Sequence, residues 1–151
     1  MGLTPYPGGH TQPEEHMKVI YKLSNRHIEQ LHQLYQKEWW TKARTLEDTR
    51  KCVANSQLCI ALVDTQDNLI GFARVLTDFT FKALVFDVMV REDQRGKGLG
   101  NRLMGLIKSH EQLSGVKHLE LYCLPDMNDF YAKHGFTTDV CGAQLMRYDN
   151  T

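Results

Sequence analysis

The chain has 151 residues, which is enough for one domain with a sizeable hydrophobic core. Its 18 basic and 18 acidic residues give a formal net charge of zero. Because no basic stripe alternates with aromatic residues, the sequence argues against a nucleic-acid partner. No apolar stretch approaches the ~18 residues of a membrane-spanning helix, so we expect no membrane partner.

The spacing of cysteines and histidines and the first ten residues indicate whether to expect a metal site and which cellular compartment to expect. The four cysteines have no CxxC spacing and the seven histidines form no HxxxH pair. We therefore expect no metal site and no disulfide scaffold. The segment from Met1 to His10 lacks the basic and apolar pattern of a signal peptide. These features favour a reducing compartment, and we expect a cytoplasmic protein.

The N-terminal part of the chain changes character after residue 16. Residues 1–16 contain three prolines and three glycines and almost no large aliphatic residue, so we expect a disordered or loosely packed arm. The remainder, 17–151, is the expected folded domain. It begins with a strand over 17–23 and continues with helices over 25–38 and 45–55, the first of them capped by Ser24.

Three strands are predicted in the middle of the chain. Leu58–Val63 and Leu69–Leu76 are apolar runs joined by a short polar turn, so they form a hairpin. Ala83–Val90 is a nearly continuous apolar run, which is typical of a central strand covered on both faces.

A helix and a further strand predict a crossover after the central strand. An amphipathic stretch runs from Leu99 to Leu113, and His118–Leu124 then returns as a strand parallel to the central one. A short helix over 126–133 and two last strands within 136–148 complete the expected order. The buried stripe of the crossover helix is expected at Leu99, Leu103, Leu106 and Ile107.

A glycine-rich segment lies between the central strand and the crossover helix. Three glycines in five positions let backbone N–H groups turn inward at little steric cost. A helix that starts there adds its free N–H groups and its positive dipole end. This combination predicts a binding site for a pyrophosphate. The segment consists of Arg95, Gly96, Lys97, Gly98, Leu99 and Gly100.

The spacing argues against two common phosphate-binding motifs. A Walker loop needs Lys-Ser or Lys-Thr after its glycines, and neither is present. A Rossmann fingerprint needs G-x-G-x-x-G directly after a strand, with an acid about 20 residues further on. Here the spacing is G-x-G-x-G, polar residues separate it from the strand, and Glu120 falls inside its predicted strand. A glycine-rich turn without a ligand is the remaining alternative.

Two separated motifs resemble the GCN5-related N-acetyltransferase (GNAT) family. Arg95, Gly98 and Gly100 fill the family signature [RQ]-x-x-G-x-[GA]. The segment 129–136 resembles the family's helix that ends in F-Y-x-x-x-G-F, and 87–93 resembles its bulged strand. The resemblance covers roughly residues 17–149.

The resemblance implies the fold and the way in which acetyl-coenzyme A (acetyl-CoA) binds. The expected fold is α/β: a single mixed, mostly antiparallel sheet with helices on both faces and a central parallel strand pair that splays at the cofactor site. Backbone N–H groups of the central strand would hold the thioester carbonyl, and the glycine-rich segment would hold the pyrophosphate. The implied cofactor-binding residues are Val88, Met89, Val90, Arg95, Gly96, Lys97, Gly98, Leu99 and Gly100.

Tyr131 is the expected catalytic acid. It matches the family's tyrosine, and its hydroxyl, with an ordinary pKa near 10, carries a proton that a departing thiolate could take. The alternative is a tyrosine that packs under the last strands. One position departs from the family pattern: many members carry Asn seven residues before this Tyr, where this chain has Leu124.

Asp87 is a candidate general base. It is the one charged residue within the central strand, and a carboxylate there is costly to bury unless it is paired. A pKa raised towards 7 would suit a base. The alternative is a structural Asp, bonded to loop N–H groups or to an arginine such as Arg74. Glu38, Glu120 and a water relay are competing bases.

The acceptor site is expected where the first two helices meet the strand loops. Adjacent tryptophans in a loop suggest a pocket lining or a lid, and Arg44 could hold a carboxylate or phosphate. The alternative is a hydrophobic plug under the helices. The candidate substrate-binding residues are Trp39, Trp40, Arg44, Phe79 and Phe81.

Two function classes follow from these residues. The first is an acetyl-CoA-dependent N-acetyltransferase, in which the primary amine of a small-molecule acceptor attacks the thioester directly. The second is a non-catalytic module that binds acetyl-CoA as a sensor or complex subunit. Tyr131 favours the first class, and a homodimer is considered for either.

Overall fold

The computed structural model describes residues 17–150, so the expected arm over 1–16 lies outside the described residues. The chain divides into two compact units, Met1–Leu121 and Tyr122–Thr151, and each is described by itself. The expectation of one folded domain over 17–151 stays a prediction. Among the described residues, no helix is both long and apolar enough to cross a membrane.

The first unit is built on one mixed sheet of five strands, in the order β1-β2-β3-β4-β5. All neighbouring strands pair antiparallel except β4 and β5, which pair parallel. The predicted hairpin and the predicted parallel crossover are therefore confirmed. The strands are β1 (Lys18–Ile20), β2 (Leu58–Val63), β3 (Leu69–Thr77), β4 (Lys82–Val90) and β5 (His118–Leu121).

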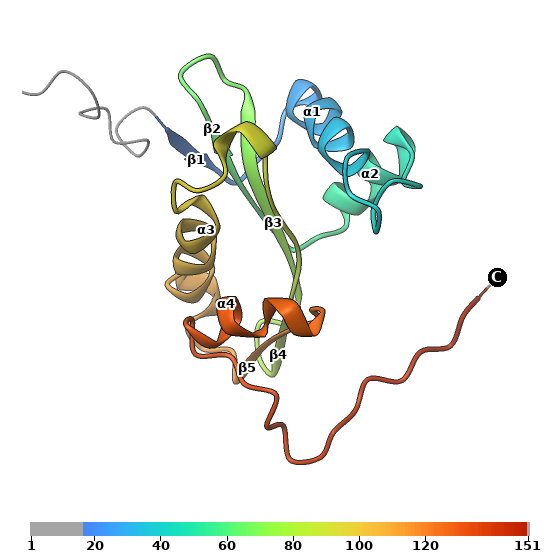
Figure 1. Ribbon diagram of the computed structural model, residues 1–151, viewed down its shortest axis with the longest axis vertical. Helices are drawn as coiled ribbons and strands as arrows, with labels where there is room; N and C mark the ends of the chain where they lie inside the picture. The colour runs from blue at the N-terminus through green and yellow to red at the C-terminus, as the bar shows by residue number, and fades with distance from the viewer. Residues whose placement is uncertain (1–16, 151) are drawn as a thin grey trace, which may run out of the picture. The chain divides into compact units, whose positions relative to one another are not determined.

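Helices cover both faces of this sheet, as the fold prediction requires. Figure 1 shows α1 and α2 on one side of the strands and α3 on the other. Ser24 caps α1 as expected, because its hydroxyl accepts the N–H of His27. The helices of this unit are α1 (Asn25–Tyr35), α2 (Leu46–Ala54) and α3 (Leu99–Lys108), and short 3₁₀ turns lie at η2 (Glu92–Gln94) and η3 (Glu111–Leu113).

Two apolar cores lie on the two faces of the sheet. On the α3 side, Met104 is fully buried and Leu106 is not, so the predicted stripe is wrong at one position. The other stripe positions, Leu99, Leu103 and Ile107, are buried as expected. On the α1 side the buried cluster consists of Leu31, Leu34, Tyr35, Cys59, Ala61, Leu69, Phe72 and Met89.

Strand β4 is irregular in its second half. Phe72 pairs with Met89 and Arg74 pairs with Phe86, so β3 has one residue in this interval where β4 has two. The extra residue makes a β-bulge, and Asp87 within it has a φ of 55°. The parallel pairing with β5 covers only Lys82 to Val85. The pairing ends with β5 itself, at Leu121, so beyond Val85 β4 has no parallel neighbour among the described residues. This open strand edge lies where the splay was expected.

The second unit contains η4 (Pro125–Met127) and α4 (Asn128–Ala132), and no strand among residues 133–150. The prediction of two strands within 136–148 is therefore wrong for this structure. The turn that would join them is present: the Ala143 N–H bonds to the Val140 carbonyl, and Cys141 and Gly142 have φ values of 58° and 80°. Such turns favour hairpins, but an isolated two-stranded hairpin is only marginally stable.

Two glycines of the α3 region predict opposite effects of the same substitution. A Cβ at Gly105 or at Gly98 would meet no atom within 4 Å, but Gly98 has a φ of 79° and Gly105 is helical. Gly105→Ala should raise the free energy of unfolding by ~0.5–1 kcal/mol. Gly98→Ala should lower it by ~1–2 kcal/mol, because an L-residue is strained there. Urea denaturation measures both, and equal effects would contradict the assigned backbone.

Candidate functional site

The glycine-rich segment forms a loop between η2 and α3. Gly96 and Gly98 have φ values of 78° and 79°, a left-handed conformation that favours glycine. Gly98 is the N-cap of α3 and supplies no capping side chain. A Cβ at either position would meet no atom within 4 Å. Glycine is therefore favoured by the left-handed backbone conformation and not by a lack of space for a side chain.

This loop presents unpaired donors. Among the described residues, the backbone N–H groups from Gly96 to Gly100 donate no hydrogen bond, and the first bond of the α3 ladder is Arg102 N–H to the Gly98 carbonyl. The Nε of Arg102, on the first turns of α3, is also buried without a partner within residues 17–150. Consecutive free N–H groups at a helix N-terminus bind phosphate oxygens well. The loop therefore presents the donors that an anion site requires.

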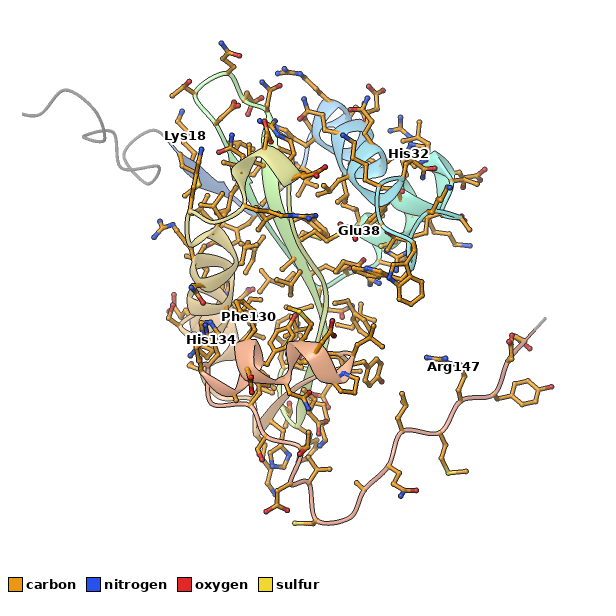
Figure 2. The ribbon with its side chains drawn as sticks, viewed as in Figure 1. Lys18, His32, Glu38, Phe130, His134 and Arg147 are labelled. Atoms are coloured by element: carbon orange, nitrogen blue, oxygen red, sulfur yellow. The ribbon has the colours of Figure 1, made fainter. Side chains whose placement is uncertain are left out.

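Arg95 fastens the start of this loop to two other elements. Its Nε donates to the Val90 carbonyl at 3.2 Å, and its Nη2 donates to Glu38 Oε1 at 2.7 Å. Glu38 belongs to the connection between α1 and α2 (Figure 2). The Arg95 side chain therefore joins the end of β4 to that connection. Glu38 was expected only as a competing base, and its ion pair with Arg95 was not predicted.

Asp87 is the centre of a buried hydrogen-bond network. Its Oδ2 accepts from Tyr35 Oη, Arg44 Nη1 and Arg74 Nε, each at 2.7 Å. Its Oδ1 accepts from Arg44 Nη2 at 3.2 Å. The Asp87 side chain is only 2% exposed. The role of Tyr35 was not predicted. It could have been inferred because Tyr35 carries a hydroxyl on an otherwise apolar helix face and Asp87 is a strand carboxylate that needs donors.

This network sets the protonation state of Asp87. Burial alone would raise the pKa of the Asp87 carboxyl, but hydrogen bonds from Arg44, Arg74 and Tyr35 outweigh burial and hold the pKa below its ordinary value. Burial and the neighbouring Asp87 charge raise the pKa of Tyr35, so its hydroxyl keeps the proton it donates. The direction is opposite to that expected of a base. The geometry favours the alternative, an arginine-paired structural carboxylate, and a basic role for Asp87 stays a prediction.

The candidate acceptor residues do not gather at one place. Arg44 lies against Asp87, whereas Phe79 and Phe81 belong to the turn between β3 and β4. Backbone bonds join this turn to the start of β5, ~17 Å along β4 from Asp87. Trp39 and Trp40 are 76% and 45% exposed, so they do not form a buried plug.

Tyr131 lies on α4 in the second unit. Burial, followed by the neighbouring Cys123, raises the pKa of its hydroxyl, which is therefore protonated at neutral pH. Its ring packs edge-on against Phe130 and Phe136. Phe130 and His134, labelled in Figure 2, also pack edge-on, with ring centroids 5.3 Å apart. A protonated phenol suits a catalytic acid, and this role of Tyr131 stays a prediction.

Metal ligands and disulfides do not contribute to the described site. Within residues 17–150, His, Cys, Asp and Glu side chains form no group of three or more that could hold a metal ion. The four cysteines are free thiols. Burial raises the pKa of the Cys59 thiol to about 11, so this thiol is inert at neutral pH.

The Asp87 network predicts a large, pH-dependent contribution to stability. Asp87→Asn should lower the free energy of unfolding by about 3–5 kcal/mol at pH 7, because it leaves two guanidinium groups without their carboxylate. The folded pKa is lowered, so this contribution is present above pH ~3.9 and is lost as pH falls through the folded pKa. The difference in free energy of unfolding between wild type and Asp87→Asn, measured by denaturation from pH 7 to 3, should therefore shrink as the pH falls below ~3.9.

Asp93→Asn is the matched control for this experiment. Asp93 also pairs with an arginine, Arg91, but lies at the surface, where ion pairs contribute little. This variant should unfold close to wild type at every pH. An Asp87→Asn protein as stable as the control would show that the network is not a structural anchor.

Comparisons with known proteins agree with this geometry. The family model described as "Acetyltransferase (GNAT) domain" matches residues 54–138. The uncharacterized N-acetyltransferase ycf52 of Pyropia yezoensis is 33% identical over 134 residues, which cover 85% of this chain and 76% of that protein. Serotonin N-acetyltransferase 2, chloroplastic, of Oryza sativa subsp. japonica is 32% identical over 100 residues, which cover 64% of this chain and 50% of that protein.

The solved structures agree as well. A protein from Xanthomonas campestris pv. campestris, described as an acetyltransferase of the GNAT family, superimposes with a TM-score of 0.78 at 28% identity, covering 89% of this chain and 94% of that one. A sheet whose strand β4 has no parallel neighbour beyond Val85, a glycine loop with free N–H groups and these similarities lead to one conclusion: the chain belongs to the GCN5-related N-acetyltransferase family.

Proposed function

We propose that this acetyltransferase transfers the acetyl group of acetyl-CoA to the primary amine of a small-molecule acceptor by direct attack in a ternary complex. One observation carries the donor assignment: the free N–H groups from Gly96 to Gly100 follow a strand whose second half has no parallel neighbour among the described residues. A pyrophosphate suits the N–H groups. A pantetheine chain, with its amide groups, suits the unpaired strand edge.

The residues present fit acetyl-CoA in a simple order along the chain. The loop 95–100 binds the pyrophosphate, with Arg102 Nε as an additional buried donor. The thioester oxygen is held by the segment Val88, Met89 and Val90, at and after the bulge, through those backbone N–H groups that point away from β3. Donors aimed at that oxygen stabilise the negative charge that develops when the amine attacks. The strand and the loop thus position the two ends of one extended ligand.

Direct transfer needs two proton movements and no enzyme nucleophile. The neutral amine nitrogen forms a bond to the acetyl carbon, the carbon–sulfur bond breaks, and the electron pair leaves on sulfur. Tyr131 gives its proton to this thiolate, and the proton that the new amide sheds passes to water or a nearby base. Trp39, Trp40 and Arg44 are retained as proposed acceptor contacts. Phe79 and Phe81 lie ~17 Å along β4 from Asp87, so only an extended acceptor would also reach them.

A non-catalytic binding module is the second candidate. It is favoured because the Asp87 carboxylate already accepts four hydrogen bonds and is therefore a poor base. The protonated phenol of Tyr131 favours turnover instead. Thiol release from acetyl-CoA across a panel of primary amines separates the two classes: release with any amine indicates an enzyme, and a thermal shift without release indicates a module. We also propose a reducing compartment, the cytoplasm first, because all four cysteines are free.

Acetyl-CoA should raise the melting temperature, while NADH and ATP should do so far less. A ligand that binds only the folded state adds about 2.7 kcal/mol at 100-fold excess over Kd. Gly98→Val should abolish the shift, because a β-branched side chain would enter the loop and strain its backbone. Differential scanning fluorimetry measures this. Equal shifts with NADH would point to a Rossmann-like site and against the proposed donor.

Tyr131→Phe should lower kcat by ~10²-fold or more, the range expected when a general acid is removed. The substitution keeps the ring and its edge contacts, so Kd for acetyl-CoA and the melting temperature should change little. Phe130→Leu, next to it on α4, is a packing control that should affect stability more than the hydroxyl loss does. An unchanged kcat in Tyr131→Phe would rule out the acid role.

A further inference from the structure

The Asp87 network contains more positive than negative charge. Two guanidinium groups, of Arg44 and Arg74, share the single carboxylate of Asp87. Their side chains are 30% and 13% exposed, while Asp87 is 2% exposed. One arginine would neutralise the carboxylate, so the site keeps one surplus positive charge in a half-buried position.

Among the described residues, no carboxylate other than Asp87 forms an ion pair with Arg44 or Arg74. Glu38 is bound to Arg95 at 2.7 Å. Asp48, which feels the Arg44 charge, lies at the surface and accepts the N–H of Thr45 at the start of α2. The surplus charge is therefore left for water or for a ligand.

The two arginines also have unused donors that reach solvent. A guanidinium carries five N–H donors. Arg44 gives one bond from each Nη to Asp87, and Arg74 gives its Nε to Asp87 and reaches the Ser56 hydroxyl only at 3.5 Å. Within residues 17–150, Arg102 Nε is the sole buried side-chain nitrogen or oxygen without a partner. Arg44 Nε and Arg74 Nη2 make no hydrogen bond within these residues either, so these two atoms are not fully buried.

Packing holds both guanidinium groups in fixed orientations. Arg44 lies over the Tyr35 ring at 4.5 Å, and Arg74 lies over the Phe86 ring at 4.9 Å. The backbone of Arg44 is held as well, because its carbonyl accepts from Gln36 Nε2 at 2.9 Å. Rigid planar donors bind carboxylate or phosphate oxygens with little loss of conformational entropy.

This charge lies beside the proposed reaction centre. Asp87 directly precedes Val88, the first of the residues assigned to the thioester. The Asp87 side chain, one guanidinium group and two hydrogen bonds would separate an anion bound to Arg44 and Arg74 from the strand backbone, roughly 10 Å in all. A small molecule with its amine and its acidic group at opposite ends can span such a distance.

We propose that the acceptor amine carries an anionic oxygen group, a carboxylate or a phosphate, and that Arg74 and Arg44 bind this group. The assignment rests on the acetyltransferase function proposed above and narrows its substrate class. Arg74 supplies the surplus charge and an Nη2 group that has no partner among the described residues. Arg44, which lies in the connection between α1 and α2, keeps Asp87 paired and borders the anion site on that side.

Matched acceptor pairs test the preference. Tyramine against tyrosine adds a carboxylate, and glucosamine against glucosamine 6-phosphate adds a phosphate. With wild-type protein and saturating acetyl-CoA, the acidic member of at least one pair should have a kcat/KM ~10-fold or more above its neutral partner, as one charge-assisted hydrogen bond gives. The pair that responds identifies carboxylate or phosphate. Neutral members preferred in both pairs would overturn the proposal and leave the proposed function standing.

Variants assign the preference to Arg74. Arg74→Met leaves Asp87 paired with Arg44 and Tyr35, so the protein should fold, keep its thermal shift with acetyl-CoA, and lose the preference for the acidic acceptor. Arg74→Lys keeps the charge without the planar fork and should retain part of the preference. Arg50→Met, at a surface arginine that pairs with Glu29, is the matched control and should behave as wild type.

A binding measurement separates failure of this inference from failure of the proposed function. Inorganic phosphate and succinate are titrated calorimetrically into protein saturated with coenzyme A, which fills the glycine loop. Binding of either anion that Arg74→Met weakens ~10-fold or more, and that Arg50→Met leaves intact, supports the anion site even if no amine releases thiol. No anion binding overturns the site, whereas thiol release without an acidic preference overturns the substrate class alone.

Discussion

The structure of the first unit depends on one buried carboxylate in a strained position. Asp87 has a positive φ, which costs of order 1–3 kcal/mol for a residue with a side chain, and its carboxylate would be expensive to bury alone. Donors from α1, from the connection between α1 and α2, and from β3 offset these costs. Three elements that are distant in sequence are thereby fixed to one point of β4. The bulge is then a stable feature of the strand rather than a defect.

The bulge and the glycine loop frame the same short segment of strand. On one side of Val88–Val90, the Asp87 network holds the strand against α1. On the other side, Arg95 binds the Val90 carbonyl and Glu38. The connection between α1 and α2 therefore touches both ends of this segment, through Arg44 and through Glu38. A backbone held at both ends, without a parallel neighbour beyond Val85, keeps its N–H groups in place for a ligand.

The sequence was most informative where the physics is local. The hairpin, the crossover and the glycine loop follow from hydrophobic periodicity and turn chemistry within short windows, and the structure contains all three. Hydrogen bonds and ion pairs between side chains far apart in the sequence could not be predicted from local patterns. The Tyr35 hydroxyl looked like part of an apolar stripe, and the separation of Phe79 from Arg44 needed the register of β4. The two strands expected within 136–148 are absent although a suitable turn lies between them, because pairing also requires a neighbouring edge, which no local pattern specifies.

The surplus charge beside Asp87 also bears on how an amine could react without a dedicated base. An ammonium ion cannot attack a thioester, and at neutral pH most primary amines carry that charge. A neighbouring positive charge disfavours the protonated form and lowers the pKa of the amine. With Asp87 already accepting four hydrogen bonds, the arginines would hold the acidic group of the acceptor on the proposed function. The negative charge of that bound group offsets the single surplus positive charge, so no net positive charge is left to favour the neutral amine. The pair that keeps Asp87 from serving as a base therefore leaves removal of the amine proton to water or to another group.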